Sequence, residues 1–254
     1  MLRLEDLAKS YGGVRAVDGV SFSIAAGTIT GLIGPNGAGK TTTFNMIAGA
    51  ETPTSGRILF QDQDITGVAT HELCHRGIVR TFQLPKEFAK LTVLENLMAA
   101  APNQYGENIW ANWLAPSKVR TREAEVRAQA EQALDFLTLS HLADELAGNL
   151  SGGQKKLLEL GRTMMTDAKL VLLDEPGAGV NPTLMQKLSE MIRQLNRERG
   201  YTFCIIEHDM DLIASLCDPV IVLAGGRLLM QGTIEEVRAD ERVIDAYFGG
   251  EEAA

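Results

Sequence analysis

A short apolar segment followed at once by a glycine-rich loop constrains the fold of this chain more than any other feature. Residues 29–33 read Ile-Thr-Gly-Leu-Ile, and residues 34–41 read Gly-Pro-Asn-Gly-Ala-Gly-Lys-Thr. This spacing is typical of a phosphate-binding loop, which requires a buried strand before it and a helix after it. Residues 42–48 are compatible with that helix. The sequence therefore predicts an α/β fold with the loop between a core strand and a helix.

The residue types in this loop suit a polyphosphate. Its glycines allow successive backbone N–H groups to point inward, and the following helix brings the positive end of its dipole to the same oxygens. Lys40 supplies a positive charge for the β- and γ-phosphates, and Thr41 offers a hydroxyl to Mg²⁺. We therefore expect the chain to bind a nucleoside triphosphate together with Mg²⁺.

Composition narrows the class of protein. A chain of 254 residues fits one large domain, or one core with a smaller lobe. Its 24 basic and 33 acidic residues give a formal charge of −9, which argues against sequence-independent binding of nucleic acid. The three cysteines show no metal-ligand spacing and predict reduced thiols in a cytosolic protein. No signal peptide and no apolar stretch near the roughly 20 residues of a membrane span are visible.

The hydrophobic pattern changes twice along the chain. Alternating residues before the loop predict half-buried strands, whereas the pattern from residue 91 to 165 is helical. From residue 170 short, fully apolar runs return, and such runs suit strands that are covered on both faces. The pattern predicts a core of roughly residues 1–83 and 167–254, interrupted by a helical lobe of roughly residues 84–166.

Residues 170–175, Leu-Val-Leu-Leu-Asp-Glu, read as an apolar strand that ends in two carboxylates. Asp174 can complete the shell of Mg²⁺, and Glu175 is placed to polarise an attacking water. Acids that merely cap a helix are the alternative interpretation. A complete phosphate loop in the same chain favours the catalytic one.

Residues 150–154, Leu-Ser-Gly-Gly-Gln, predict a second anion site. Ser151 and Gln154 have the spacing of a capping box, so a helix begins here. A helix N-terminus with two glycines before its first turn also binds anions. Because the chain already has a phosphate loop for its own nucleotide, a second site makes sense if it serves the nucleotide of another subunit.

Together these segments resemble the ATP-binding subunit of an ATP-binding cassette (ABC) transporter, whose signature is Leu-Ser-Gly-Gly-Gln. The resemblance covers essentially the whole chain. It implies a P-loop (RecA-like) ABC ATPase core with an N-terminal antiparallel β subdomain and an inserted α-helical subdomain. It also implies a head-to-tail dimer of cassettes, in which each ATP lies on one subunit's loop and is closed by the other's signature. The implied ATP contacts are Tyr11, Gly34, Pro35, Asn36, Gly37, Ala38, Gly39, Lys40, Thr41 and Thr42, with Ser151, Gly152, Gly153 and Gln154 of the partner subunit.

The resemblance assigns further roles. Tyr11 is similar to the aromatic that stacks on adenine, although it also fits an ordinary strand-edge tyrosine. Gln83 resembles the glutamine that joins core to lobe and senses Mg²⁺ and water, and His208 resembles the switch histidine that contacts the γ-phosphate. The loop 177–182 resembles the one through which subunits communicate, but Asn181 replaces the usual Asp and also reads as a helix cap. The implied catalytic residues are Glu175, His208, Gln83 and Lys40, and the implied Mg²⁺ ligands are Thr41, Gln83 and Asp174.

Four local strings, at residues 80–83, 177–182, 206–210 and 246–249, resemble the ATP-binding subunits of branched-chain amino-acid importers. Subunits of urea or amide importers and of the lipopolysaccharide exporter are near alternatives. A soluble ABC ATPase acting on DNA or ribosomes, or a non-catalytic cassette, is more distant. The importer type implies a second cassette, identical or related, permease subunits and indirectly a solute-binding protein, with the chain peripheral at the cytoplasmic face of the membrane. Residues 102–117, with Trp110 and Trp113, lie near the membrane partner or anchor an irregular loop.

Overall fold

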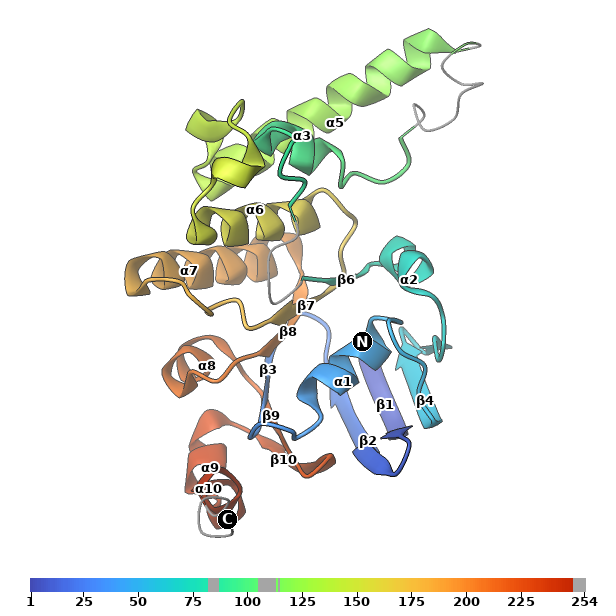
Figure 1. Ribbon diagram of the computed structural model, residues 1–254, viewed down its shortest axis with the longest axis vertical. Coiled ribbons are helices and arrows are strands. Elements are labelled where there is room, and N and C mark those ends of the chain that lie inside the picture. The colour runs from blue at the N-terminus through green and yellow to red at the C-terminus, as the bar shows by residue number, and fades with distance from the viewer. Residues whose placement is uncertain (82–86, 105–112, 114, 249–254) are drawn as a thin grey trace. The chain divides into compact units, whose positions relative to one another are not determined.

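A computed structural model describes residues 1–81, 87–104, 113 and 115–248 (Figure 1). The chain divides into two compact units. The sheet unit comprises Met1–Gln83, Lys169–Ala178 and Ser189–Ala254, and the helical unit comprises Leu84–Ala168 and Gly179–Leu188. Among the described residues, no helix combines the length and the hydropathy that a membrane span requires.

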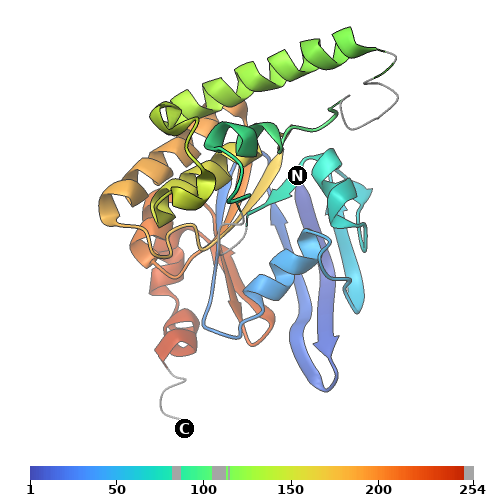
Figure 2. The ribbon, with the colours of Figure 1, turned by 45° about the horizontal axis from the view of Figure 1, so that its top comes forward.

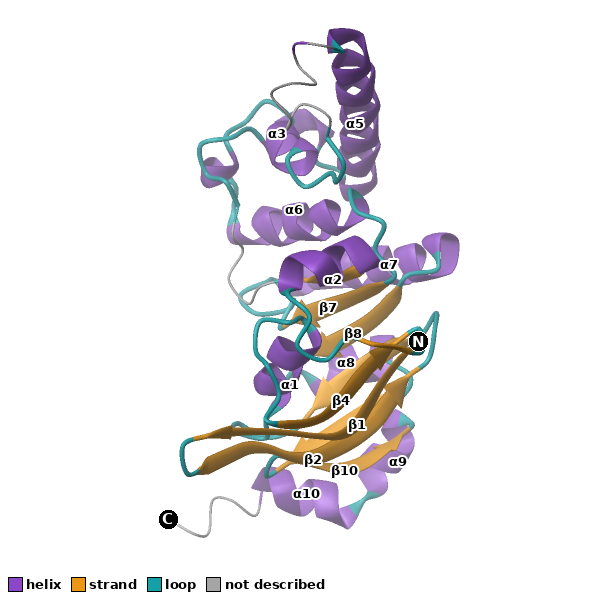
Figure 3. Ribbon diagram, turned by 90° about the vertical axis from the view of Figure 1, so that its right-hand side faces the viewer, coloured by secondary structure: helices purple, strands orange, loops and turns teal. Residues whose placement is uncertain are grey.

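The sheet unit contains two sheets (Figure 3). One is antiparallel with the order β2-β1-β4-β5; its strands are β1 (Leu2–Tyr11), β2 (Val14–Ile24), β4 (Ser55–Phe60) and β5 (Gln63–Asp64). The other has the order β10-β9-β3-β8-β7-β6; its strands are β3 (Ile29–Ile33), β6 (Ile78–Arg80), β7 (Leu170–Asp174), β8 (Thr202–Ile206), β9 (Val220–Ala224) and β10 (Arg227–Gly232). All neighbours in this second sheet are parallel except β9 and β10.

The register of the second sheet brings three strand ends together. Leu32 near the end of β3 pairs with Ile206 at the end of β8, and Ile206 pairs with Asp174 at the end of β7. All residues of these three strands are buried, as expected of parallel strands covered on both faces. Loops that follow the carboxyl ends of adjacent parallel strands form the usual ligand site of an open α/β sheet.

Helices complete both units. Those of the sheet unit are α1 (Lys40–Ile47), α2 (Thr70–Arg76), α8 (Met210–Leu216), α9 (Ile234–Ala239) and α10 (Glu241–Phe248). In the described part of the helical unit, the helices are α3 (Val93–Met98), α5 (Pro116–Leu137) and α6 (Gly152–Met164), with short 3₁₀ turns at Ser140–Leu142 and Ala147–Asn149. The boundary between the units falls within α7 (Pro182–Arg199).

One hydrophobic core joins the two sheets of the sheet unit. Buried side chains of both sheets meet those of α1, which lies beside β1 and β2 in Figure 2. Phe44 on α1, Phe22 on β2 and Leu172 on β7 belong to this cluster. Burying a large apolar side chain of this kind contributes about 1.5–3 kcal/mol to stability. The packing fixes the helix that carries Lys40 against the strands that carry the other candidate residues.

Gly31, in the middle of β3, is packed closely against α8. A Cβ atom added at Gly31 would lie 3.1 Å from Cδ1 of Ile213 and 3.2 Å from Cβ of Cys217. Real side chains rarely approach so closely, so the absence of a side chain at Gly31 allows α8 to contact the strand directly. The strand that leads to the phosphate loop therefore also supports the helix that follows His208.

Candidate functional site

The phosphate loop connects β3 to α1, as the sequence predicts. Gly34 has φ 150° and Gly39 has φ 90°, values that residues with a Cβ atom rarely adopt. An added Cβ would lie 2.1 Å from the carbonyl oxygen of Leu223 at Gly34, and 2.5 Å from that of Ala16 at Gly39. Glycine is thus required at both positions by conformation and by space. The loop is held between β9 and β2, the strands that contribute these carbonyls.

Lys40, the first residue of α1, directs its ammonium group back into the loop. Nζ donates hydrogen bonds to the carbonyl oxygens of Gly34 (2.7 Å) and Pro35 (3.0 Å). Burial lowers the pKa of Lys40, while the nearby carboxylates of Glu175 and Asp174 act in the opposite direction. The charge lies where phosphate oxygens would enter the loop. A polyphosphate can replace the two carbonyls as the partner of this ammonium group.

Asp174 ends β7 and is buried, with 4% of the residue exposed. Its Oδ2 accepts a hydrogen bond from a terminal nitrogen of Arg80 at 2.8 Å, and the other terminal nitrogen of Arg80 donates to Oδ1 of Asn45. Among the residues that the structure describes, none is a hydrogen-bond partner of the buried Nε atom of Arg80. Sequence reasoning missed Arg80 because nothing local links it to a residue 94 positions away. Arg80 is the counter-ion of the predicted metal ligand.

The donor atoms at this edge fit Mg²⁺. Asp174 supplies carboxylate oxygens and Thr41 a hydroxyl, which are the hard oxygen ligands that Mg²⁺ prefers. No group of three or more His, Cys, Asp or Glu side chains that could hold a metal occurs in the part of the chain that the structure describes. Mg²⁺ commonly binds through one or two protein ligands, waters and substrate phosphates, so this sparse set suits a nucleotide-dependent metal site. The third predicted ligand, Gln83, lies outside the described residues.

Glu175 and His208 meet at the ends of β7 and β8. Nε2 of His208 lies 2.9 Å from Oε1 of Glu175, and their side chains are 45% and 22% exposed, respectively. Glu175 has φ 49°, an uncommon value for a residue other than glycine. Two side chains predicted to be catalytic are therefore in direct contact and still reachable by solvent.

Glu207, between β8 and His208, is a buried acid that sequence reasoning missed. Its Oε1 accepts a hydrogen bond from the backbone N–H of Gly177 at 2.6 Å, and its Oε2 accepts one from the backbone N–H of His208 at 3.2 Å. Burial raises the pKa of Glu207, the two hydrogen bonds lower it, and the nearby carboxylates of Glu175 and Asp209 raise it further. The sequence pattern that could have pointed to Glu207 is an acidic residue directly after an apolar strand.

Tyr11 ends β1 and is 47% exposed. Its hydroxyl donates a hydrogen bond to the carboxylate of Glu51, and Nζ of Lys9 lies 5.2 Å from the ring centroid. Burial raises the pKa of Tyr11, and Glu51 raises it further. Glu51 also accepts a hydrogen bond from Asn45 at 2.6 Å. Asn45 is the residue that Arg80 contacts, so one hydrogen-bonded chain links Tyr11 to Asp174.

The signature forms the first turn of α6 in the helical unit. Ser151 Oγ accepts from the N–H of Gln154 at 3.3 Å, and Gln154 Oε1 accepts from the N–H of Ser151 at 2.8 Å, so the predicted capping box is confirmed. Asn181 caps α7, its Oδ1 accepting from the N–H of Leu184 at 2.9 Å. Trp113 is 84% exposed, whereas Trp110 lies outside the described residues.

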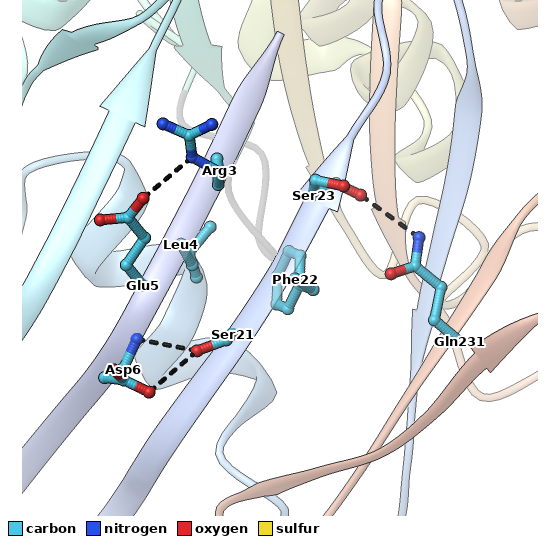
Figure 4. Close-up of a pocket in the computed structure, with 8 residues that line it drawn as sticks. All are labelled: Arg3, Leu4, Glu5, Asp6, Ser21, Phe22, Ser23 and Gln231. Atoms are coloured by element: carbon cyan, nitrogen blue, oxygen red, sulfur yellow. Dashed lines mark hydrogen bonds and ion pairs between the residues drawn. The ribbon is translucent and has the colours of Figure 1, made fainter.

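An open hollow over β1, β2 and β10 is separate from this site (Figure 4). Its polar side chains bond within the protein: Arg3 pairs with Glu5 at 3.0 Å, and the N–H of Asp6 donates to Oγ of Ser21 at 2.8 Å. None of the predicted site residues lines it. The chemistry of the chain therefore concentrates at the strand ends rather than in this hollow.

Comparison with known proteins identifies the family. Residues 17–178 match the family model described as ABC transporter. The chain belongs to the ABC transporter family as an ATP-binding cassette. Residues 227–253 of the cassette also match a model described as branched-chain amino acid ATP-binding cassette transporter. The cassette therefore binds and hydrolyses ATP, and the predicted ABC ATPase fold is confirmed.

Relatives match the cassette over its full length. A probable branched-chain amino acid transport ATP-binding protein of Archaeoglobus fulgidus is 40% identical, covering 100% of this chain and 97% of its own. A high-affinity branched-chain amino acid transport ATP-binding protein of Pseudomonas aeruginosa is 37% identical, covering 98% of both chains. A nucleotide-free ATP-binding cassette of an ABC transporter superposes with a TM-score of 0.85 at 42% identity, covering 98% of this chain and 99% of that one. These findings do not favour the exporter or the soluble alternatives.

Proposed function

We propose that this cassette is the ATP-hydrolysing subunit of an importer for branched-chain amino acids. The observation that supports this most directly is the match of residues 227–253 to a model specific for that transporter class, together with full-length relatives of that name. The proposal places the chain at the cytoplasmic face of the membrane as a peripheral subunit. The sheet unit and the helical unit then serve as core and lobe of one ATP-binding domain.

Binding of ATP begins with the loop and with Lys40. Phosphate oxygens take the place of the Gly34 and Pro35 carbonyls on the ammonium group, and the backbone N–H groups of the loop converge on the same anion. Thr41, Asp174 and Gln83 would hold Mg²⁺, which neutralises charge on the phosphate oxygens when bound. Tyr11 stacks on the adenine ring. The residues from Gly34 to Thr42 surround the phosphates.

Hydrolysis relies on the contact between Glu175 and His208. Glu175 accepts a hydrogen bond from the attacking water and draws its proton, because a carboxylate within reach of the nucleophile can polarise it. His208, 2.9 Å away, orients that carboxylate and reaches the γ-phosphate. Lys40 stabilises the charge that develops on the transferred group. Gln83 would complete this set by contacting the water and, when it is bound, Mg²⁺.

Dimerisation completes the site. The partner subunit contributes a helix N-terminus formed by its Ser151, Gly152, Gly153 and Gln154. Such a helix end attracts the γ-phosphate of the nucleotide bound to the phosphate loop of this subunit. ATP therefore has a higher affinity for the closed dimer than for separate cassettes, and so stabilises that dimer. Hydrolysis removes this stabilisation and favours opening of the dimer. A related cassette from Clostridium perfringens, 29% identical with a TM-score of 0.80 and covering 98% of this chain and 96% of its own, is described as part of an ABC transporter complex. By this proposal permease subunits, and indirectly a solute-binding protein, complete the importer.

The role of Glu175 is tested with two variants and one control. Glu175→Gln should bind ATP with unchanged affinity but turn it over at least about 100-fold more slowly, because the amide cannot take a proton from water. Lys40→Ala should lose ATP binding, because the buried loop then lacks its positive charge. Glu123→Gln, an exposed change on α5, is the control and should behave as wild type. Hydrolysis by Glu175→Gln at the wild-type rate would show that the role is misassigned.

Substrate class requires the assembled transporter. We expect the chain to co-purify with permease subunits from membranes. Proteoliposomes of that complex, with the solute-binding protein added outside, should accumulate labelled leucine when ATP is enclosed. Excess unlabelled isoleucine should abolish the uptake, and excess urea should not. Uptake that responds to urea alone, or lipid extraction in place of uptake, would reject the branched-chain assignment while leaving the ATPase intact.

A further inference from the structure

Glu207 bridges the two chain segments that carry Glu175 and His208. Its side chain leaves the end of β8 and accepts hydrogen bonds from the backbone N–H of Gly177 at 2.6 Å and from that of His208 at 3.2 Å. Gly177 follows Glu175 by two residues along the exit from β7. One carboxylate thus fixes the main chain on both sides of the contact between the two candidate catalytic residues.

The conformation of Glu175 needs such support. A φ of 49° brings the Cβ atom of an L-residue close to its own carbonyl group, so a non-glycine residue keeps it only where neighbours impose it. The N–H of Glu175 donates to the carbonyl oxygen of Ile206 at 2.9 Å, and Gly177 is tied to Glu207. Glu175 is therefore held from both sides by Ile206 and Glu207, consecutive residues at the end of β8.

The chemistry of an acid suits this position. A carboxylate has two oxygens that only accept hydrogen bonds, and here two N–H donors meet it. A glutamine would turn its NH₂ group toward one of those donors. The residue is only 5% exposed and lies near the carboxylates of Glu175 and Asp209, surroundings that oppose a buried negative charge. An apolar residue would avoid that penalty, so the acid has a role that burial alone does not provide.

We propose that Glu207 is a positioning residue for ATP hydrolysis, which sets the distance between Glu175 and His208 by anchoring the backbone amides of Gly177 and His208. The inference depends on the roles proposed above for Glu175 and His208. In this role Glu207 acts through the two backbone amides and not by contact with the water or the phosphate. Its effect should therefore fall on turnover rather than on nucleotide binding.

The test measures kcat, KM for ATP and nucleotide affinity for Glu207→Ala and Glu207→Gln, with kcat expressed per nucleotide-binding site. Glu207→Ala should lower kcat at least tenfold while KM and affinity change less than twofold. Glu207→Gln, which keeps one acceptor and the side-chain volume, should recover part of that loss. Asp209→Asn is the control: it removes a neighbouring charge but keeps the hydrogen bonds to the N–H groups of Asp211 and Leu212, and should leave kcat unchanged.

A purely structural role predicts a different result. Glu207→Ala would then unfold at a lower temperature, and fewer of its sites would bind nucleotide. A kcat per site that stays at the wild-type value would overturn the proposal. In a Glu175→Gln background, adding Glu207→Ala should cause a smaller loss in single-turnover hydrolysis than it causes in the wild type, whereas an equal loss would show independent action. Wild-type turnover by Glu175→Gln itself would remove the proposed function. If Glu175→Gln loses turnover while Glu207→Gln and Glu207→Ala keep wild-type turnover, the proposed function stands and only the positioning role of Glu207 is rejected.

Discussion

Replacing Arg80 with methionine should destabilise the sheet unit in a way that Mg²⁺ and nucleotide partly reverse. The guanidinium group pairs with Asp174 at 2.8 Å, and the two side chains are only 14% and 5% exposed. Removing one partner of a buried ion pair leaves an uncompensated charge and costs about 3–5 kcal/mol. Because the pair reaches solvent at its arginine end, we expect the lower part of that range, about 3 kcal/mol.

The expected loss converts into a measurable change in melting temperature. For a chain of this size about 1 kcal/mol corresponds to roughly 2–4 °C, so Arg80→Met should melt about 6–12 °C below wild type. The assay is thermal unfolding followed by circular dichroism, with and without Mg²⁺ and a non-hydrolysable ATP analogue. A cation bound by Asp174 replaces the lost guanidinium, so ligand should raise the melting temperature of the variant more than that of wild type.

An exposed ion pair provides the matched control. Arg127 pairs with Glu131 at 3.0 Å on α5, and both side chains are more than half exposed. Such pairs contribute at most about 1 kcal/mol, so Arg127→Met should shift the melting temperature by less than about 4 °C. A melting temperature of Arg80→Met no lower than that of Arg127→Met would refute this role of Arg80. An equal rise of the wild-type and Arg80→Met melting temperatures with Mg²⁺ and nucleotide would refute it as well.

Two further predictions follow from the loop and from the thiols. Gly34→Ala should lose ATP binding, because its φ of 150° is unfavourable for alanine and its Cβ would lie 2.1 Å from the Leu223 carbonyl oxygen. Gly37→Ala is strained by a φ of 78°, but its Cβ meets no atom within 4 Å, so it should retain more binding; equal losses in a nucleotide-binding assay would contradict this. A thiol reagent at pH 8 should modify Cys74 in the folded chain and all three cysteines after denaturation, because Cys204 and Cys217 are buried and burial raises the pKa of Cys217 to about 12. Rapid modification of three thiols in the folded chain would show that these sites open readily.

The features that sequence predicts correctly here are local. The phosphate loop, the apolar run ending in Asp174 and Glu175, and the capping box at Ser151 each lie within a few consecutive residues, so spacing alone reveals them. The short apolar strands are equally legible, because parallel strands covered on both faces lose the alternation of a half-exposed strand. The resemblance to a family then orders these segments into one fold.

The features that sequence misses depend on pairing between distant segments. Arg80 contacts Asp174 because β6 lies beside β7, and Glu207 reaches Gly177 because β7 lies beside β8. No periodicity within either segment encodes that adjacency. The buried acid after β8 could be suspected from its position, but its two donors become known only when the register is known.

The close contact at Gly31 ties two catalytic segments to one piece of main chain. Helix α8 begins two residues after His208, and its Ile213 side chain packs on β3 at Gly31, where the strand has no side chain of its own. Strand β3 runs directly into the loop that holds Lys40. Lys40 and His208 therefore lie on segments that both connect to this one contact between strand and helix. A bulkier residue at position 31 would push α8 away from β3, and would thereby displace His208 relative to Lys40 without contacting the nucleotide.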